Sequence, residues 1–126
     1  MASRFDRDPN ASGPLVQGFA GRGFRVDGGV YEGLFLTPRR ADQWNAPPLA
    51  ELSLEDLAPL LGLDPLPEFL LLGTGANMAF PPRALVAALD ERGVGIEAMD
   101  SRAAARTWGM LRGEERWIAA ALMPLA

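Results

Sequence analysis

The second half of the chain alternates short apolar runs with amphipathic stretches, and this alternation restricts the fold more than any other feature of the sequence. Residues 69–72 are Phe-Leu-Leu-Leu, an unbroken apolar run typical of a strand buried on both faces. Residues 95–99 and 117–122 are two further short runs that we predict as strands. A helical segment separates each run from the next. The predicted order β-α-β-α-β implies right-handed crossovers and a largely parallel sheet.

The first of these helices is predicted at residues 82–92. Pro82 suits a position near the start of a helix, where a missing N–H costs little. Gly93 suits the C-terminal stop, because glycine readily adopts a positive φ. Leu85 and Leu89 are about one turn apart and form the expected core face.

The second helix is predicted at residues 101–112. Its apolar stripe recurs at i, i+4 and i+7 and consists of Ala104, Trp108 and Leu111. Asp100 or Ser101 is the expected N-terminal cap, because a short polar side chain accepts hydrogen bonds from the first free amides of a helix. Gly113 is the expected stop.

The first third of the chain is predicted to be β. The predicted strands cover residues 15–19, 24–26, 30–36 and 42–45. Asp27, Gly28 and Gly29 lie between the second and third of them and give a strong hairpin signal, because glycine tolerates positive φ. Ser53 then opens a short helix with a capping-box-like start, and Gly62 ends it.

These elements predict an α/β fold, a three-layer single domain with a mixed central sheet. N-terminal antiparallel hairpin strands are followed by β-α-β-α-β. Residues 1–14 are polar and carry glycine and proline, so we expect a disordered tail there. Residues 15–126 are expected to form a single α/β domain, which suits a chain of 126 residues.

The chain lacks three residue types that carry much of protein chemistry. All 12 basic residues are arginine, and the chain has no lysine, histidine or cysteine. This excludes a Ser-His-Asp triad, a thiol nucleophile, a Schiff base and a P-loop lysine. No aspartate or glutamate cluster has metal-loop spacing. We therefore expect no catalytic residue of a known type, no metal site and no cofactor.

Charge and hydropathy narrow the partners and the compartment. The net charge is −4, which gives no basic footprint for nucleic acid. The longest apolar stretch, residues 117–123, is far short of the roughly 20 residues that span a bilayer. The N-terminal residues have no apolar core of a signal peptide, so we expect a cytoplasmic protein that does not span the membrane.

A glycine-containing loop after the buried strand is the first candidate binding feature. Residues 73–79 read G-x-G-x-x-x-A, which suggests a dinucleotide-binding turn. In that motif, however, the helix opens within the glycines, whereas Pro81 and Pro82 place the helix start several residues later. We therefore favour a wide strand-to-helix loop over a nucleotide site.

The position of this loop still suggests a crevice, because ligands of open α/β sheets bind beyond the C-terminal ends of the strands. The candidate residues at these ends are Gly73, Thr74, Gly75, Asp100, Ser101 and Arg106. The free amides of a helix starting at Ser101, together with Arg106, would suit an anion or the acidic group of a partner. The other interpretation is that Asp100 and Ser101 simply cap the helix and that Arg106 is solvated.

Several blocks of the sequence, taken in order, resemble one known family. The blocks are residues 31–34, 69–75, 80–82, 93–101, 103–107 and 116–122. They are similar to the family of mitochondrial respiratory complex I assembly factor 3, also known as domain of unknown function 498, and the resemblance covers residues 15–125. Where that family leads us to expect a cysteine and an asparagine, this chain has Ala105 and Gly109.

The resemblance implies a compact three-layer α/β domain with a mixed sheet. It also implies a role like that of the eukaryotic members, which help to assemble the membrane-linked arm of complex I. It carries over no catalytic residue. The first hypothesis is thus a bacterial, non-enzymatic accessory protein whose partner is a membrane-complex subunit or an assembly protein. The alternative is a small anionic-ligand-binding protein or enzyme that uses the crevice. The chain is expected to be a monomer or a homodimer.

Overall fold

The computed structural model describes residues 13–126, and the predicted tail therefore lies outside the described residues except for Gly13 and Pro14. The strands are β1 (Gly18–Ala20), β2 (Gly23–Val26), β3 (Gly29–Tyr31), β4 (Leu34–Leu36), β5 (Ala41–Gln43), β6 (Phe69–Gly73), β7 (Gly95–Met99) and β8 (Ala119–Leu122). The helices are α1 (Ala58–Leu61), α2 (Arg83–Glu91) and α3 (Ser101–Gly113), with 3₁₀ turns at Leu49–Glu51 and Leu54–Leu57. None of the helices in the described part is long and apolar enough to cross a membrane.

The strands form two sheets. Strands β1, β2 and β3 make a small antiparallel sheet, and the larger sheet has the order β5-β4-β8-β6-β7. Strand β6 runs parallel to both β7 and β8, whereas β4 pairs antiparallel with β5 and β8. The predicted α/β class with a mixed sheet is confirmed. The β-α-β-α-β order is confirmed as β6-α2-β7-α3-β8.

The sequence prediction of one strand over residues 30–36 is wrong. The chain leaves the small sheet after β3 and enters the large sheet at β4, with a bend at Glu32 and Gly33. The Trp44 N–H donates to the Gly33 carbonyl oxygen at 2.9 Å, and a Cβ on Gly33 would collide with the Trp44 backbone. The close approach of another segment ends the strand here, and local hydropathy does not report such an approach.

Three other strands begin or end differently from their predictions. Residues 15–19 contribute only their end to β1, residues 42–45 only their beginning to β5, and residues 117–122 form a strand from Ala119 onward. The helix predicted after Ser53 is a 3₁₀ turn followed by the short α1. At its start the Asp56 carboxylate accepts from both the Ser53 N–H at 2.9 Å and the Ser53 hydroxyl at 3.0 Å.

The two longer helices are confirmed to within a residue or so. Pro82 lies just before α2 as its N-cap residue, and Leu85 and Leu89 are buried. Asp100 is the N-cap of α3, where its carboxylate accepts from the Ala103 N–H at 2.9 Å. The helix runs on to Gly113, one residue beyond its predicted end.

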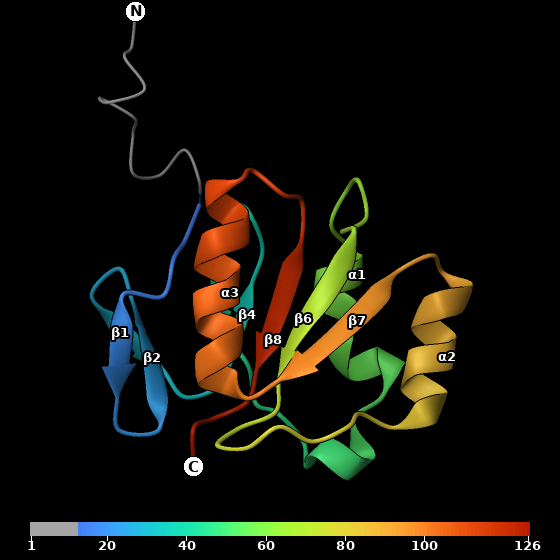
Figure 1. The fold of residues 1–126 in the computed structure, drawn as a ribbon, viewed down its shortest axis with the longest axis horizontal. Coiled ribbons are helices and arrows are strands. Elements are labelled where there is room, and N and C mark those ends of the chain that lie inside the picture. The colour runs from blue at the N-terminus through green and yellow to red at the C-terminus, as the bar shows by residue number, and fades with distance from the viewer. Residues whose placement is uncertain (1–12) are drawn as a thin grey trace, which may run out of the picture.

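Three layers result, with a core on each face of the large sheet. Figure 1 shows α3 in front of β4 and beside β8, and α1 behind β6. Leu70 and Leu72 point into the core beneath α1 and α2, whereas Leu71 points into the core that α3 shares with the small sheet. Trp108 of α3 is fully buried in that second core, and its indole N–H donates to the Pro14 carbonyl at 2.9 Å.

Candidate functional site

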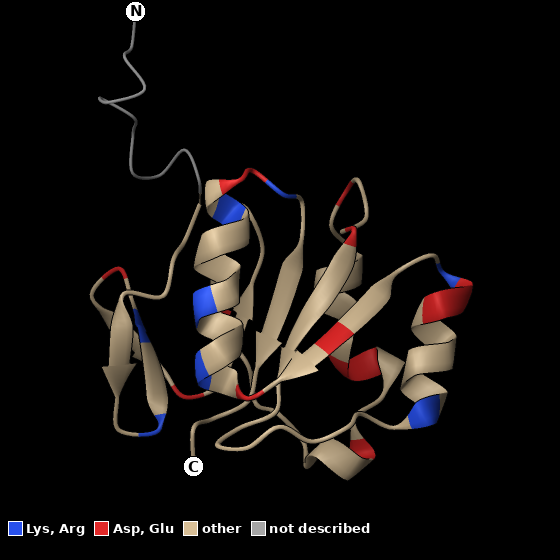
Figure 2. Cartoon of the chain, viewed as in Figure 1, with Lys and Arg blue, Asp and Glu red and all other residues tan. Residues whose placement is uncertain are grey.

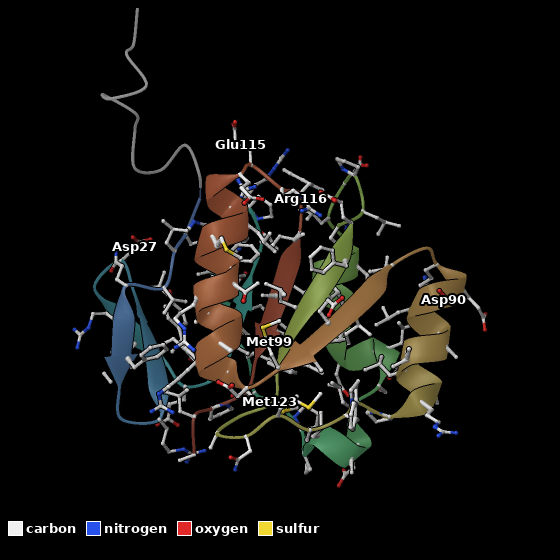
Figure 3. All side chains as sticks on the ribbon, in the orientation of Figure 1. Asp27, Asp90, Met99, Glu115, Arg116 and Met123 are labelled. Atoms are coloured by element: carbon white, nitrogen blue, oxygen red, sulfur yellow. The ribbon has the colours of Figure 1, made fainter. Side chains whose placement is uncertain are left out.

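The predicted crevice residues that follow β6 and β7 come together around a buried hydroxyl. The Ser101 hydroxyl accepts from the Gly75 N–H at 2.8 Å and donates to the Met123 carbonyl at 2.8 Å. Ser101 is fully buried. Because Met123 directly follows β8, the Ser101 side chain links the ends of three parallel strands, β6, β7 and β8. Figure 3 places Met99 and Met123 near this edge of the sheet.

Gly73 allows β6 to approach the start of α3. A Cβ on residue 73 would lie 2.7 Å from Ser101 Oγ and 2.9 Å from Leu122 Cδ2, closer than real Cβ atoms come. Gly75 has a φ of +101°, which other L-residues rarely adopt. The two glycines are therefore explained by close packing and turn geometry, as the sequence analysis favoured over a nucleotide-binding role.

Thr74 holds the long loop that precedes α2. Its hydroxyl oxygen lies 2.7 Å from the Asn77 carbonyl oxygen and accepts from the Ala79 N–H at 3.1 Å. Its backbone N–H donates to the Met99 carbonyl at 2.9 Å and so extends the pairing of β6 with β7. The threonine folds the loop back on itself at the end of the sheet.

Arg106 is placed away from the other predicted residues. Ser101 and Arg106 are five positions apart, so they lie about 140° apart around the axis of α3. Arg106 is exposed and lines a shallow hollow of about 170 Å³ against β1, together with Gln17 and Phe19. The structure thus brings together the Gly73, Thr74, Gly75, Asp100 and Ser101 positions and leaves Arg106 outside this group.

A hollow of about 410 Å³ lies beyond the strand ends. Its lining includes Thr74 and Gly75 from the predicted site, with Pro47, Met123 and Arg22 from elsewhere. Arg22 comes from the turn between β1 and β2, and its carbonyl accepts from the Leu125 N–H at 2.8 Å. Sequence analysis missed Arg22 because only the tertiary fold carries this turn to the C-terminal ends of the large sheet.

The side chains at the C-terminal ends of these strands offer few groups for chemistry. No buried side-chain nitrogen or oxygen among the described residues lacks a hydrogen-bond partner. Nor do these residues bring three potential metal-binding side chains together. The hollow is lined by one exposed arginine, Arg22, and otherwise mainly by small and apolar residues.

An electrostatic pair lies at the opposite end of β6. The Arg116 guanidinium donates to the Glu68 carboxylate at 2.9 Å, and the Trp117 N–H donates to the same group at 3.2 Å. The hydrogen bond from Arg116 is the main reason that the pKa of Glu68 lies below its ordinary value, and the bond from Trp117 acts in the same direction. Both side chains are exposed, so the pair is a surface feature outside the candidate crevice.

A larger hollow lies between α2 and the edge strand β7. We call it the β7–α2 groove; its volume is about 680 Å³, and it is lined in part by Phe80, Arg83, Val86, Asp90 and Ile96. Phe80 is 83% exposed and Val86 is 39% exposed. The sequence signal for this groove was Phe80, an aromatic residue in a proline-containing loop, but only the sheet order shows that the loop lies beside a free edge.

The family comparison decides which proteins this chain is related to. Residues 16–123 match the model of a family described as "Protein of unknown function (DUF498/DUF598)". The chain belongs to this family. The resemblance found in the sequence is thereby confirmed.

DUF498 relatives include assembly factors and a bacterial protein of similar length. A zebrafish (Danio rerio) protein named NADH dehydrogenase [ubiquinone] 1 alpha subcomplex assembly factor 3 is 32% identical over 90% of this chain and 66% of its own length. An uncharacterised protein of Rhodobacter capsulatus is 34% identical over 94% of this chain and 92% of its own. The chain therefore spans about two thirds of the zebrafish protein and nearly all of the bacterial one.

Solved structures of bacterial proteins have the same fold. A crystal structure of a Bordetella parapertussis protein has a TM-score of 0.79 and 31% identity, and the match covers 88% of this chain and 95% of that one. The three-layer arrangement with two sheets is thus shared with an experimentally determined structure.

Proposed function

We propose that this chain is a non-enzymatic accessory protein that helps to assemble a membrane-bound complex through contacts with other proteins. The observation that carries the proposal is the relationship to proteins named as assembly factors of NADH dehydrogenase, which holds over 90% of this chain. The respiratory complex I of the host is the first complex to test. The chain spans only part of the vertebrate relatives, so the role is proposed for the shared domain.

The surface of the domain supports protein contacts over catalysis. The polar groups at the strand ends are occupied by bonds within the chain, whereas Phe80 and Val86 leave apolar surface open at the β7–α2 groove. Exposed apolar patches beside polar residues are typical of protein interaction sites. A cytoplasmic location remains a prediction, as does the choice between monomer and homodimer.

Deletion of the gene in its native host tests the proposed function. We expect less fully assembled complex I on native gels and lower NADH:quinone activity in membranes, both restored by the intact chain. Crosslinking followed by mass spectrometry should identify a complex subunit or an assembly protein next to the tagged chain. Normal amounts of every membrane complex in the deletion strain would refute the proposal.

A second candidate function is binding of a small anionic ligand in the crevice at the strand ends. The hollow beside Thr74 and Gly75 and the exposed guanidinium of Arg22 favour it. The test is a thermal-shift screen with phosphate, carboxylate and nucleotide anions, with Arg22→Ala and Arg106→Ala as variants. A Tm increase that Arg22→Ala removes and Arg106→Ala retains would place the ligand in the hollow. No shift with any anion would exclude this function.

A further inference from the structure

The free edge of β7 leaves backbone hydrogen-bonding groups without a strand partner. Among residues 13–126, β7 is the last strand of the large sheet, and its only neighbour in that sheet is β6. The Met99 carbonyl accepts from the Thr74 N–H, so it faces β6. Because the N–H and C=O of a residue point to the same side and alternate along a strand, those of Ile96 and Ala98 face outward.

This edge carries little of the protection that natural sheets use against added strands. Edge strands are commonly shielded by proline, by lysine, by a bulge or by a covering segment. β7 contains no proline and one charged residue, Glu97, and it pairs with β6 in regular register over all five of its residues. In Figure 1 α2 lies beyond β7, and the β7–α2 groove of about 680 Å³ lies between this helix and the strand.

The β7–α2 groove borders the face of β7 toward which every second side chain of an added strand would point. Ile96 packs against the core beneath α1 and α2, so one face of β7 borders the groove. Glu97 is the next residue along the strand and therefore lies on the opposite face. A strand added to β7 would place every second side chain against Phe80 and Val86, and the side chains between them beside Glu97.

The charges beside this edge indicate which occupant fits. Figure 2 shows acidic residues on β7 and at the C-terminal end of α2, and a basic residue at the start of α2. A second copy that paired antiparallel about Glu97 would set two Glu97 side chains directly opposite each other, which is unfavourable. Two copies with a net charge of −4 each also repel. A basic residue on a different chain would instead be attracted to Glu97.

We propose that β7 and the β7–α2 groove bind an extended segment of a partner protein, which adds to the sheet as a sixth strand. The segment has apolar side chains at alternate positions toward Phe80 and Val86, and an arginine or lysine opposite Glu97. Backbone hydrogen bonds to Ile96 and Ala98 hold the segment, and the side chains determine which sequence binds. This inference rests on the proposed function, because it names the surface through which the protein contacts would be made.

Selection from a random twelve-residue peptide display library on the intact chain provides the probe. We expect enriched sequences that alternate apolar residues and carry arginine or lysine at one position between them. Binding of the best synthetic peptide is then measured by fluorescence polarisation. In NMR titrations the amides of Ile96 and Ala98 should shift, whereas those that face β6 should change less.

Three variants separate backbone pairing, the groove and the charge. Ala98→Pro removes one outward N–H without removing a donor to β6, and Phe80→Ser removes exposed apolar surface. Each should weaken binding at least ten-fold while the Tm stays close to that of the parent chain. Glu97→Arg should weaken the selected peptide and strengthen a matched peptide with glutamate in place of its basic residue.

Met110→Ser is the matched control, because Met110 is 60% exposed but lies on α3, away from the groove. It should leave peptide binding unchanged. If Ala98→Pro destabilises the fold, the Phe80→Ser and Glu97→Arg results decide alone. Failure to enrich alternating peptides, or unchanged binding by Phe80→Ser and Glu97→Arg, would overturn the proposal. A dimer in light scattering that Phe80→Ser dissociates would also overturn it, because a second copy would then occupy the edge.

The same variants in the native host distinguish this inference from the proposed function. If the gene is required for complex assembly but the Phe80→Ser and Glu97→Arg chains restore it fully, the function stands and the surface is wrong. If both variants lose the peptide but deletion of the gene leaves every membrane complex intact, the surface stands and the assembly role fails.

Discussion

Gly73 and Ser101 show how single residues determine the packing at the C-terminal ends of β6, β7 and β8. Ser101 can bond to both neighbouring strand ends only because β6 passes within reach of its hydroxyl. That approach requires a residue without a side chain at position 73. Gly73 and Ser101 are therefore explained by contacts within the protein. A ligand at the strand ends would have to bind to the surface beyond these two residues.

Gly73→Ala tests this packing requirement. We expect a loss of about 1–3 kcal/mol in the free energy of unfolding, because the added methyl group collides with Ser101 and Leu122 and overpacks the site. Urea titration followed by tryptophan fluorescence measures the change.

Gly109→Ala is the control for the same substitution elsewhere. A Cβ on Gly109 meets no atom within 4 Å, and the residue lies inside α3. Alanine should therefore stabilise the protein by up to about 1 kcal/mol through its helix propensity. If both variants changed stability in the same direction, the collision at residue 73 would not be the cause.

At the scale of elements, the capping residue Asp100 determines where α3 begins. The Asp100 carboxylate accepts from the Ala103 N–H and replaces one hydrogen bond that the first turn lacks. This role accounts for Asp100 without a ligand. It also explains why β7 can end and α3 begin with no intervening loop.

Asp100→Ala should lower the free energy of unfolding by about 0.5–2 kcal/mol, because the helix loses its N-terminal cap. Asp100→Asn keeps an acceptor oxygen and should retain most of the stability. Differential scanning calorimetry on both variants measures the difference. Equal destabilisation by alanine and asparagine would show that the negative charge at residue 100, rather than the capping bond, is what matters.

The Glu68 and Arg116 pair connects the segment before β6 with the segment before β8 and predicts a dependence on pH. The folded state holds the pKa of Glu68 below its ordinary value, chiefly through the hydrogen bond from Arg116. A lowered folded-state pKa gives stability that is present above the ordinary glutamate pKa of about 4.3 and is lost as pH falls through the folded value. The Tm of the parent chain should thus fall more between about pH 5 and pH 3 than that of Glu68→Gln.

The measurement is thermal unfolding by circular dichroism at several pH values. Asp42→Asn serves as a comparison. Asp42 also pairs with an exposed arginine, Arg40, but these two residues are close in the sequence, so their pair does not connect distant segments. Parallel pH curves for the parent chain and Glu68→Gln would contradict the assigned role of the pair.

At the scale of the whole molecule, the small sheet is attached to the rest of the domain through the apolar core that it shares with α3. Phe24 and Val26 of β2 are buried in the same cluster as Trp108 of α3 and Leu36 of β4. Within the described part of the chain, the small sheet shares no strand pairing with the large one, so side-chain burial carries much of the attachment. We expect both sheets to unfold together.

Phe24→Ala should lower the free energy of unfolding by about 3–5 kcal/mol, because a fully buried aromatic side chain leaves a cavity between the layers. Phe19→Ala is the control, since Phe19 contacts Phe24 edge-on but is 38% exposed. It should cost much less. Separate transitions for tryptophan fluorescence and for circular dichroism in the parent chain would show that the layers unfold independently.

Local pattern was sufficient for the elements whose own residues carry a clear apolar run or a clear helical spacing. The apolar run after Glu68 identified β6, and residues 95–99 matched β7 at both ends. Leu85, Leu89 and Trp108 were predicted as core residues from helical spacing and are buried. Residues 30–36 failed because one apolar run serves two sheets, and the bend between them depends on Trp44, which lies more distant in the sequence.

The sequence by itself determined the β-α-β-α-β order, a cap for α3 at Asp100 or Ser101, the family and the absence of lysine, histidine and cysteine. These depend on local spacing and residue type. Only the tertiary structure decided that Arg22 reaches the strand ends and that β7 has a free edge beside Phe80. Strand order and the approach of distant segments arise from long-range packing, which the pattern of neighbouring residues does not encode.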